Sequence, residues 1–160
     1  MTAIRKRAIL GIKTGDVFTV RRTFTEADMI KFAGITKDYN PVHFEDAFAH
    51  SKRFSSRICH GLLAAGLITE IGGQIGWLAT GMHFEFKKPV YFNDTVTCRF
   101  TVREVNENRR VTAMADYRNQ RGETVIKAVI TGLLPNKQER EIMARMVAKG
   151  DPTNGVMRDG

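Results

Sequence analysis

The chain has 160 residues, of which 42% are hydrophobic and 26% charged, values that suit one globular domain and exclude a fibrous or disordered protein. Its 25 lysines and arginines exceed its 17 aspartates and glutamates, for a formal net charge of +8. Such an excess of positive charge is compatible with three kinds of anionic partner: nucleic acid, an anionic membrane or a phosphorylated small molecule. Half of it lies in residues 1–13, which hold four cations and no acid. We therefore divide the chain into a basic N-terminal arm (1–13), a domain (14–135), and a C-terminal helix and tail (136–160).

The two cysteines, Cys59 and Cys98, are too few for a disulfide framework and lack the spacing of metal ligands. No apolar run approaches the roughly 18 residues of a membrane span, and residues 8–12 are too short for a signal-peptide core. These features predict a protein of the reducing cytoplasm that binds no metal and no membrane.

Three elements are expected in the first part of the chain. Residues 16–22 favour a strand, and residues 26–34 a helix with Thr25 as N-cap and Asp28 completing a capping box. Residues 35–60 are polar and read as a long irregular loop, which in a compact domain is usually functional when it is ordered. The tail from about 136 to 149 favours an amphipathic helix, followed by a frayed end at 150–160.

The second part predicts a helix followed by a sheet. Residues 61–71 are apolar nearly all round, so this helix should be buried on most sides, and Gly61 and Gly66 suggest the close approach of a backbone or ligand. Apolar residues then alternate over 82–86, 96–102, 111–117 and 123–134, as in half-buried strands joined by hairpins. The predicted fold is α+β, with an antiparallel sheet wrapped around a buried helix.

The stretch from Asp38 to His43 carries the first candidate chemistry. Pro41 fixes its own φ and Asn40 favours a turn, so the chain bends and can aim Asp38 and His43 at a common point. A carboxylate and an imidazole that share one water form a general acid–base pair. The alternative is a plain turn followed by a packed histidine.

The pair His60-Gly61, at the start of the apolar helix, is the second candidate. The first amides of a helix have no intrahelical partner and suit an oxyanion, and glycine leaves room for a carbonyl. The alternative is a glycine that is merely tolerated at a helix start.

These residues carry a family resemblance. Residues 32–69 resemble the hydratase motif of the MaoC-like dehydratases, the group that contains the (R)-specific enoyl-CoA hydratases. The matching positions are Ala33, Thr36, Asp38, Asn40, Pro41, Val42, His43, Ala47, Ala49, His60 and Gly61. The resemblance extends from about residue 15 to 134 through family-like segments at 15–18 and 86–96. One departure is Lys37, where the family usually has glycine; its ammonium near Asp38 would lower the pKa of that carboxyl.

The resemblance implies a hot-dog fold over residues 14–135, with the sheet around a long central helix, and a homodimer or dimer of dimers. It implies hydration of trans-2-enoyl thioesters to (R)-3-hydroxyacyl thioesters, or the reverse dehydration, without a cofactor. Asp38 and His43 would form the catalytic dyad and the Gly61 amide the oxyanion hole. Asn40, Pro41 and His60 would support the site.

Four cations near these motifs are candidates for the phosphates of coenzyme A or of an acyl carrier protein: Arg53, Arg57, Lys87 and Lys88. A solvated turn explains Arg53 and Arg57 equally well, and an exposed edge is the preferred interpretation of Lys87 and Lys88. Cys59, although beside His60, is expected to pack and not to react.

Two other functions remain open. A hot-dog thioesterase shares the helix-in-sheet pattern, and a non-catalytic acyl-thioester binding protein would retain the pocket. A nucleic-acid partner has no motif to support it.

Overall fold

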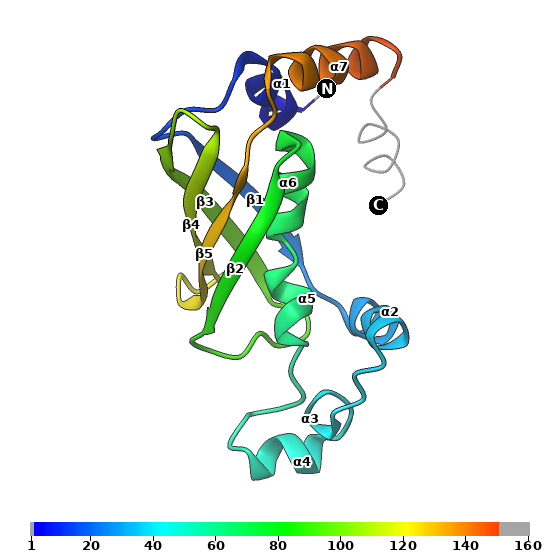
Figure 1. Cartoon of the computed structure of the whole chain (residues 1–160). Helices are drawn as coiled ribbons and strands as arrows, with labels where there is room; N and C mark the ends of the chain where they lie inside the picture. Colours follow the sequence, from blue (N-terminus) through cyan, green and yellow to red (C-terminus); the bar gives the residue numbers. More distant parts are fainter. Residues whose placement is uncertain (1, 151–160) are drawn as a thin grey trace.

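The computed structural model describes residues 2–150. The frayed end expected over 150–160 lies outside the described residues, apart from Gly150. Five antiparallel strands form one curved sheet in the order β1-β3-β4-β5-β2, which bends around α5 and α6 (Figure 1). The strands are β1 (Val17–Thr23), β2 (Leu78–Phe86), β3 (Thr95–Val105), β4 (Arg110–Arg118) and β5 (Thr124–Leu133). The predicted hot-dog architecture is confirmed.

The core lies between the concave face of the sheet and the central helix. Alternate residues of β3 and β4 are buried there, as the period of two predicts. They meet the buried side chains of the two helical segments, Ala64, Ala65, Ile68, Ile71 and Ile75. The outward residues of the same strands are mostly exposed or partly exposed.

The central helix has two segments, α5 (Gly61–Ala65) and α6 (Ile68–Ile75), with a tightened turn between them. At this turn the Thr69 amide donates to the carbonyl of Gly66 at 2.9 Å instead of to Ala65. The buried Tyr117 hydroxyl donates to the released Ala65 carbonyl at 2.9 Å. The helix is also less enclosed than expected, since Leu62 is 62% exposed.

The segment expected to be an irregular loop is partly helical. Helix α2 (Glu26–Thr36) runs two residues beyond the expected end, and its Thr25–Asp28 capping box is present. Two short helices follow, α3 (Pro41–Phe44) and α4 (Asp46–Ser51). They escape a search for hydrophobic periodicity because neither is long enough to show one.

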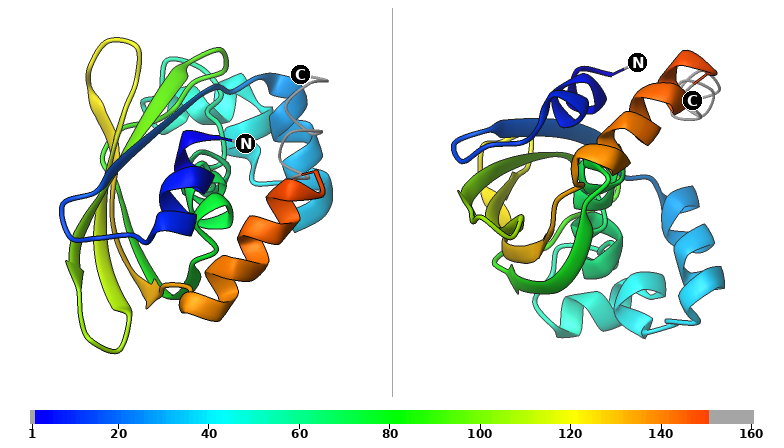
Figure 2. Two further views of the ribbon diagram at one scale, coloured as in Figure 1. Left: turned by 90° about the horizontal axis from the view of Figure 1, so that it is seen from above. Right: turned by 45° about the horizontal axis from the view of Figure 1, so that its top comes forward.

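Two helices pack at the end of the molecule opposite α3 and α4, α1 (Ala3–Leu10) and α7 (Lys137–Ala148) (Figure 2). The residues expected as a basic arm therefore form a helix that packs on α6. Thr2 Oγ1 donates to Gln74 Oε1 at 2.5 Å, Arg5 is buried, and Arg7 pairs with Asp16 at 3.0 Å.

Within residues 2–150, no helix is both long and apolar enough to cross a membrane.

Strand β2 differs from the half-buried strand that its alternation predicts. It lies at the edge of the sheet, pairs with β5 and, within the described residues, has no partner on its other edge. Phe84 is partly buried, but the other eight residues are exposed, with Leu78 at 67% and Phe86 at 53%. The apolar side chains of β2 are thus exposed to solvent in the single chain. Such an exposed apolar face is typical of a surface that contacts a partner.

Candidate active site

The turn predicted at Asn40-Pro41 is present and brings Asp38 toward His43. Asp38 Oδ1 accepts from the Asn40 amide at 3.2 Å, and Asn40 Oδ1 accepts from the Val42 amide at 3.2 Å as the N-cap of α3. Pro41 occupies the first turn of α3, where its missing N–H has no structural effect. The Asp38 carboxylate, whose side chain is 50% exposed, remains accessible to solvent.

His43 lies in α3 with 7% of its surface exposed. Its Nδ1 is 2.8 Å from the carbonyl oxygen of Ile58, which can only accept, so Nδ1 carries the proton, and Nε2 of the neutral ring is an acceptor without a bonded partner in residues 2–150. Burial lowers the pKa of His43, and the neighbouring His60 contributes in the same direction. The imidazole is therefore held neutral and ready to receive a proton near pH 7.

His60 connects the two predicted dyad residues. Its Nε2 donates to the Asp38 main-chain carbonyl at 2.9 Å and lies 3.8 Å from Asp38 Oδ2. Its ring stacks on His43 with centroids 3.8 Å apart, and Nδ1 has no partner among the described residues. Asp38, His43 and His60 thus form one cluster whose candidate ligand atoms lie within 4.8 Å of one another.

This cluster is also the place to consider for a metal ion. Two histidines and a carboxylate are common metal ligands. However, the two rings are inclined by only 29°, so lone pairs in the two ring planes run nearly side by side and do not converge on one point. The ligands would have to be the nitrogens that bond no carbonyl, His43 Nε2 and His60 Nδ1, and at least one ring would have to tilt before both pointed at one cation. The arrangement as it stands suits proton transfer better than metal binding.

Gly61 begins α5 directly after His60. The first helical bond runs from the Ala64 amide to the His60 carbonyl at 3.3 Å, so the Gly61 amide precedes it and has no intrahelical acceptor. A Cβ on residue 61 would come within 2.8 Å of the Phe86 ring. The close approach that the glycine suggested is therefore with an aromatic side chain from the end of β2.

Lys37 explains why a glycine is usual before the aspartate. It ends α2 in the left-handed region, with φ of 60° and ψ of 22°, a conformation that glycine adopts without steric strain. No ion pair joins Lys37 to Asp38 in the described part of the chain. The expected charge effect of Lys37 on Asp38 thus has no direct contact to support it.

The four candidate phosphate-binding cations differ in their surroundings. Arg57 is bound to Glu26 at 2.7 Å and to Asp46 at 3.7 Å, and so connects α2 with α4. Lys87 pairs with Glu85, and Lys88 with Glu123 at 2.7 Å. Arg53 is exposed and forms no ion pair within residues 2–150. Arg57 has a sufficient structural role, whereas the other three remain candidates.

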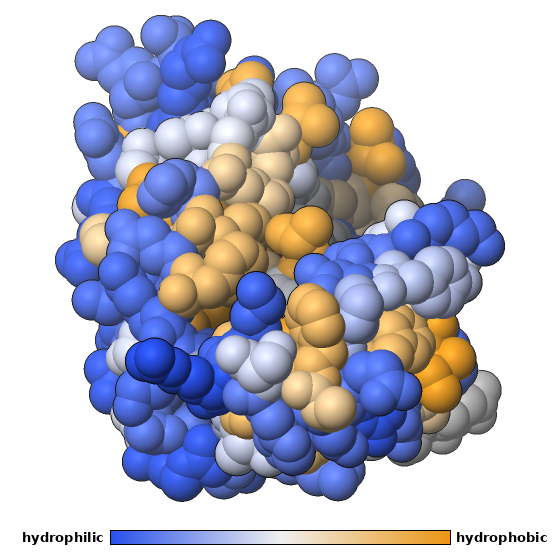
Figure 3. Space-filling model, turned by 90° about the horizontal axis from the view of Figure 1, so that it is seen from below, coloured by the Kyte–Doolittle hydropathy of each residue, from blue (hydrophilic) through white to orange (hydrophobic). Residues whose placement is uncertain are grey.

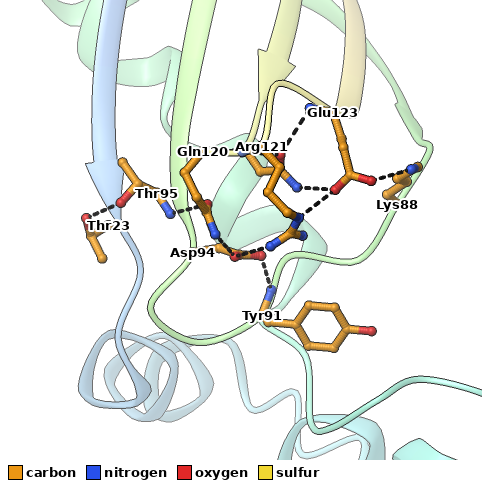
Figure 4. A network of polar contacts seen from close by, with 9 residues as sticks. Thr23, Lys88, Tyr91, Asp94, Thr95, Gln120, Arg121 and Glu123 are labelled. Atoms are coloured by element: carbon orange, nitrogen blue, oxygen red, sulfur yellow. Dashed lines mark hydrogen bonds and ion pairs between the residues drawn. The ribbon is translucent and has the colours of Figure 1, made fainter.

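The segment that connects β2 to β3 supports the site in a way that the sequence did not reveal. Cys59 donates its amide to the Val90 carbonyl at 2.8 Å, and Ile58 forms a bridge with Tyr91. Asp94, 4% exposed, accepts from the Tyr91 amide at 2.9 Å and from Gln120 and Arg121 (Figure 4). This network fixes the strand-like segment 58–59, and with it the carbonyl that holds His43. Pairing between segments as far apart as 58–59 and 90–91 leaves no local signal in a sequence.

Cys59 is buried beside the site, and burial raises the pKa of its thiol to about 12. The thiol stays protonated at neutral pH and is a poor nucleophile. The expected packing role of Cys59 agrees with this environment. On the face seen from below in the orientation of Figure 1, apolar side chains run through the middle and hydrophilic ones occupy much of the edge (Figure 3).

An antiparallel sheet curved around a helix, with acid–base residues gathered at the start of that helix, defines a hot-dog protein of the hydratase and dehydratase class. The family model described as "MaoC like domain" matches residues 11–124, and the chain belongs to this family. The (R)-specific enoyl-CoA hydratase of Rhodospirillum rubrum is 31% identical over 128 residues, which cover 78% of this chain and 89% of the relative.

Two further comparisons agree. The 3-hydroxybutyryl-CoA dehydratase of Methylorubrum extorquens is 29% identical over 143 residues, covering 87% of this chain and 91% of the relative. The solved structure of the (R)-hydratase from A. caviae superposes with a TM-score of 0.72 at 28% identity, covering 78% of this chain and 98% of that one. Helix α1, and α7 with the tail that follows it, lie outside the matched family model.

Proposed function

We propose that the protein adds water to trans-2-enoyl-CoA to give the (R)-3-hydroxyacyl thioester, or catalyses the reverse dehydration, with Asp38 and His43 as its catalytic dyad. The observation that carries this proposal is the single cluster formed by the Asp38 carboxylate and the His43 imidazole, held together by His60 and followed by the Gly61 amide, which has no intrahelical acceptor. The hydratase and dehydratase relatives support the same reaction.

The dyad performs two proton transfers. One member takes a proton from the bound water while the water oxygen bonds to C3 of the enoyl group, and the other delivers a proton to C2. The Nε2 of His43 and the exposed carboxylate of Asp38 can each accept a proton and return it, so either residue suits either role. The reverse sequence releases water from the hydroxyacyl thioester.

The Gly61 amide stabilises the charge that develops between these transfers. As the water oxygen bonds to C3, or as the C2 proton leaves in the reverse direction, the thioester carbonyl oxygen becomes enolate-like, and an amide that is already oriented binds it without reorganisation. Removal of one such donor typically costs about 10²–10³ in rate. A Cβ on residue 61 would crowd both this approach and the Phe86 ring.

The functional unit is a homodimer or a dimer of dimers. The support is β2, with its unpaired edge and exposed apolar residues, including Leu78 and Met82. A second copy of this chain would supply backbone partners and apolar cover together. Light scattering after size exclusion tests this assembly. Met82→Arg should yield monomer, whereas a wild-type monomer would contradict it.

The activity is tested by the loss of enoyl absorbance on adding crotonyl-CoA, with chiral analysis of the 3-hydroxybutyryl product. Asp38→Asn and His43→Gln should each lower kcat by at least about 10²-fold with unchanged circular dichroism. Full activity in either folded variant would remove that residue from the dyad. Release of free thiol without hydration would identify a thioesterase, and binding without any turnover a non-catalytic acyl-thioester protein.

A further inference from the structure

A cavity of about 270 Å³ lies beside Gly61, between residues 54–58 and the segment that follows β2. Its floor is apolar and buried, formed by Ala64, Val90 and Ile126. Its rim is exposed and carries Phe86, Lys87 and Lys88. An apolar channel with cations at its mouth suits an elongated, largely uncharged group that ends in phosphate.

The dyad determines which part of a thioester this cavity can receive. Ile58 and Gly61 line the cavity, whereas Asp38 and His43 do not; His43 is hydrogen-bonded to the carbonyl of Ile58. The dyad acts on C2 and C3 of the acyl group, so these carbons must face Asp38 and His43 when the thioester carbonyl is bound at Gly61. The carbonyl carbon carries the sulfur on its other side. The sulfur, and the arm attached to it, then point toward the cavity.

We propose that this cavity holds the pantetheine arm of the substrate, and that Lys88 at its rim binds the phosphate beyond the arm with an affinity set by Glu123. The inference rests on the proposed function, because it uses the direction in which the dyad places the acyl group. The Phe86 ring lines this cavity and stands against Gly61, the residue proposed to hold the reacting carbonyl.

Glu123 acts on the rim as a fixed counter-charge. It lies 2.7 Å from the Lys88 ammonium, 2.9 Å from Arg121 and 2.8 Å from the Asn119 amide nitrogen (Figure 4). The hydrogen bonds from Asn119 and Lys88 lower the pKa of Glu123 to about 2, so it is ionised throughout the physiological range. A phosphate that approaches Lys88 competes with this carboxylate, so Glu123 weakens the attraction while it holds Lys88 in place.

The test compares two substrates that share the acyl group and differ in the arm. Crotonyl-CoA carries pantetheine and phosphates, whereas the crotonyl thioester of N-acetylcysteamine carries a short arm without phosphate. Lys88→Ala should raise KM for crotonyl-CoA about threefold and leave KM for the short thioester unchanged, a modest effect because the site is exposed. Glu123→Gln should lower KM for crotonyl-CoA at low ionic strength, and added salt should remove this gain.

The matched control is Lys137→Ala, which removes the same charge from α7 at the opposite end of the molecule (Figure 1). If Lys88→Ala changes KM for both thioesters equally, or if Glu123→Gln raises KM for crotonyl-CoA, the inference is wrong although the hydratase activity stands. If wild-type protein hydrates neither thioester, the proposed function fails first, and the inference falls with it.

Discussion

The Phe86 ring lies directly on Gly61, so that a Cβ on residue 61 would come within 2.8 Å of an aromatic carbon. Gly61→Ala should therefore lower both the unfolding free energy and kcat. In the double variant with Phe86→Ala the clash disappears and stability should return. We still expect roughly 10²-fold slower hydration of crotonyl-CoA, because the added methyl displaces the thioester carbonyl. Urea unfolding and initial rates on both variants measure the two effects. A double variant with wild-type kcat would reduce Gly61 to a packing role.

The pH dependence of the enzyme should reflect the buried state of His43. Burial lowers its pKa below the 6.5 of a solvated imidazole. The acid limb of kcat/KM for crotonyl-CoA should therefore have its midpoint below pH 6.5, because the neutral ring persists there. A midpoint above 6.5 would contradict this environment for His43.

The same pKa shift predicts how stability changes with pH. As pH falls through 6.5, the unfolded chain takes up a proton at His43 more readily than the folded one, so this group lowers the unfolding free energy in acid. Urea unfolding of wild type and His43→Gln at pH 7 and pH 5 measures the effect. The wild type should lose more stability between the two pH values than the variant, and equal losses would refute the prediction.

Tyr117→Phe removes the hydroxyl that binds the Ala65 carbonyl where α5 meets α6. The carbonyl would be left buried without a partner, so we expect a loss of about 1–3 kcal/mol in unfolding free energy. Tyr91→Phe is the matched control, since that hydroxyl accepts a bond from the exposed Ser55 amide. Differential scanning calorimetry compares the two variants. An equal, small loss in both would show that the turn between the helices does not depend on Tyr117.

Lys37→Gly should stabilise the protein by about 0.5–1 kcal/mol. The left-handed conformation is sterically strained for lysine and unstrained for glycine. Glycine also raises the conformational entropy of the unfolded chain, which reduces the gain in stability. Lys31→Gly, on the exposed face of α2, is the contrasting control and should destabilise by about 1 kcal/mol. Chemical unfolding of the pair provides the measurement, and destabilisation by Lys37→Gly would contradict the argument.

The sheet was predictable because a strand that buries one face has an apolar residue at every second position. Strands β3 and β4 show this alternation from Val96 to Tyr117. The turn at Asn40 and Pro41 was equally predictable, since its chemistry is local. The break between α5 and α6 was not, because it depends on Tyr117, which is 52 residues from the carbonyl it binds. The aromatic ring that contacts Gly61 belongs to Phe86, on the distant strand β2. The sequence therefore predicted that some group lies close to Gly61 but not which one.

The uncovered strand β2 has a further consequence for the way the protein unfolds. If two copies cover each other along this strand, the folded state gains free energy from association, and mass action links that gain to concentration. The thermal midpoint should then rise as the protein is made more concentrated, and dilution alone should expose a 9-residue edge with apolar side chains to other chains. A higher protein concentration would therefore keep β2 covered and protect the protein from aggregation through this edge.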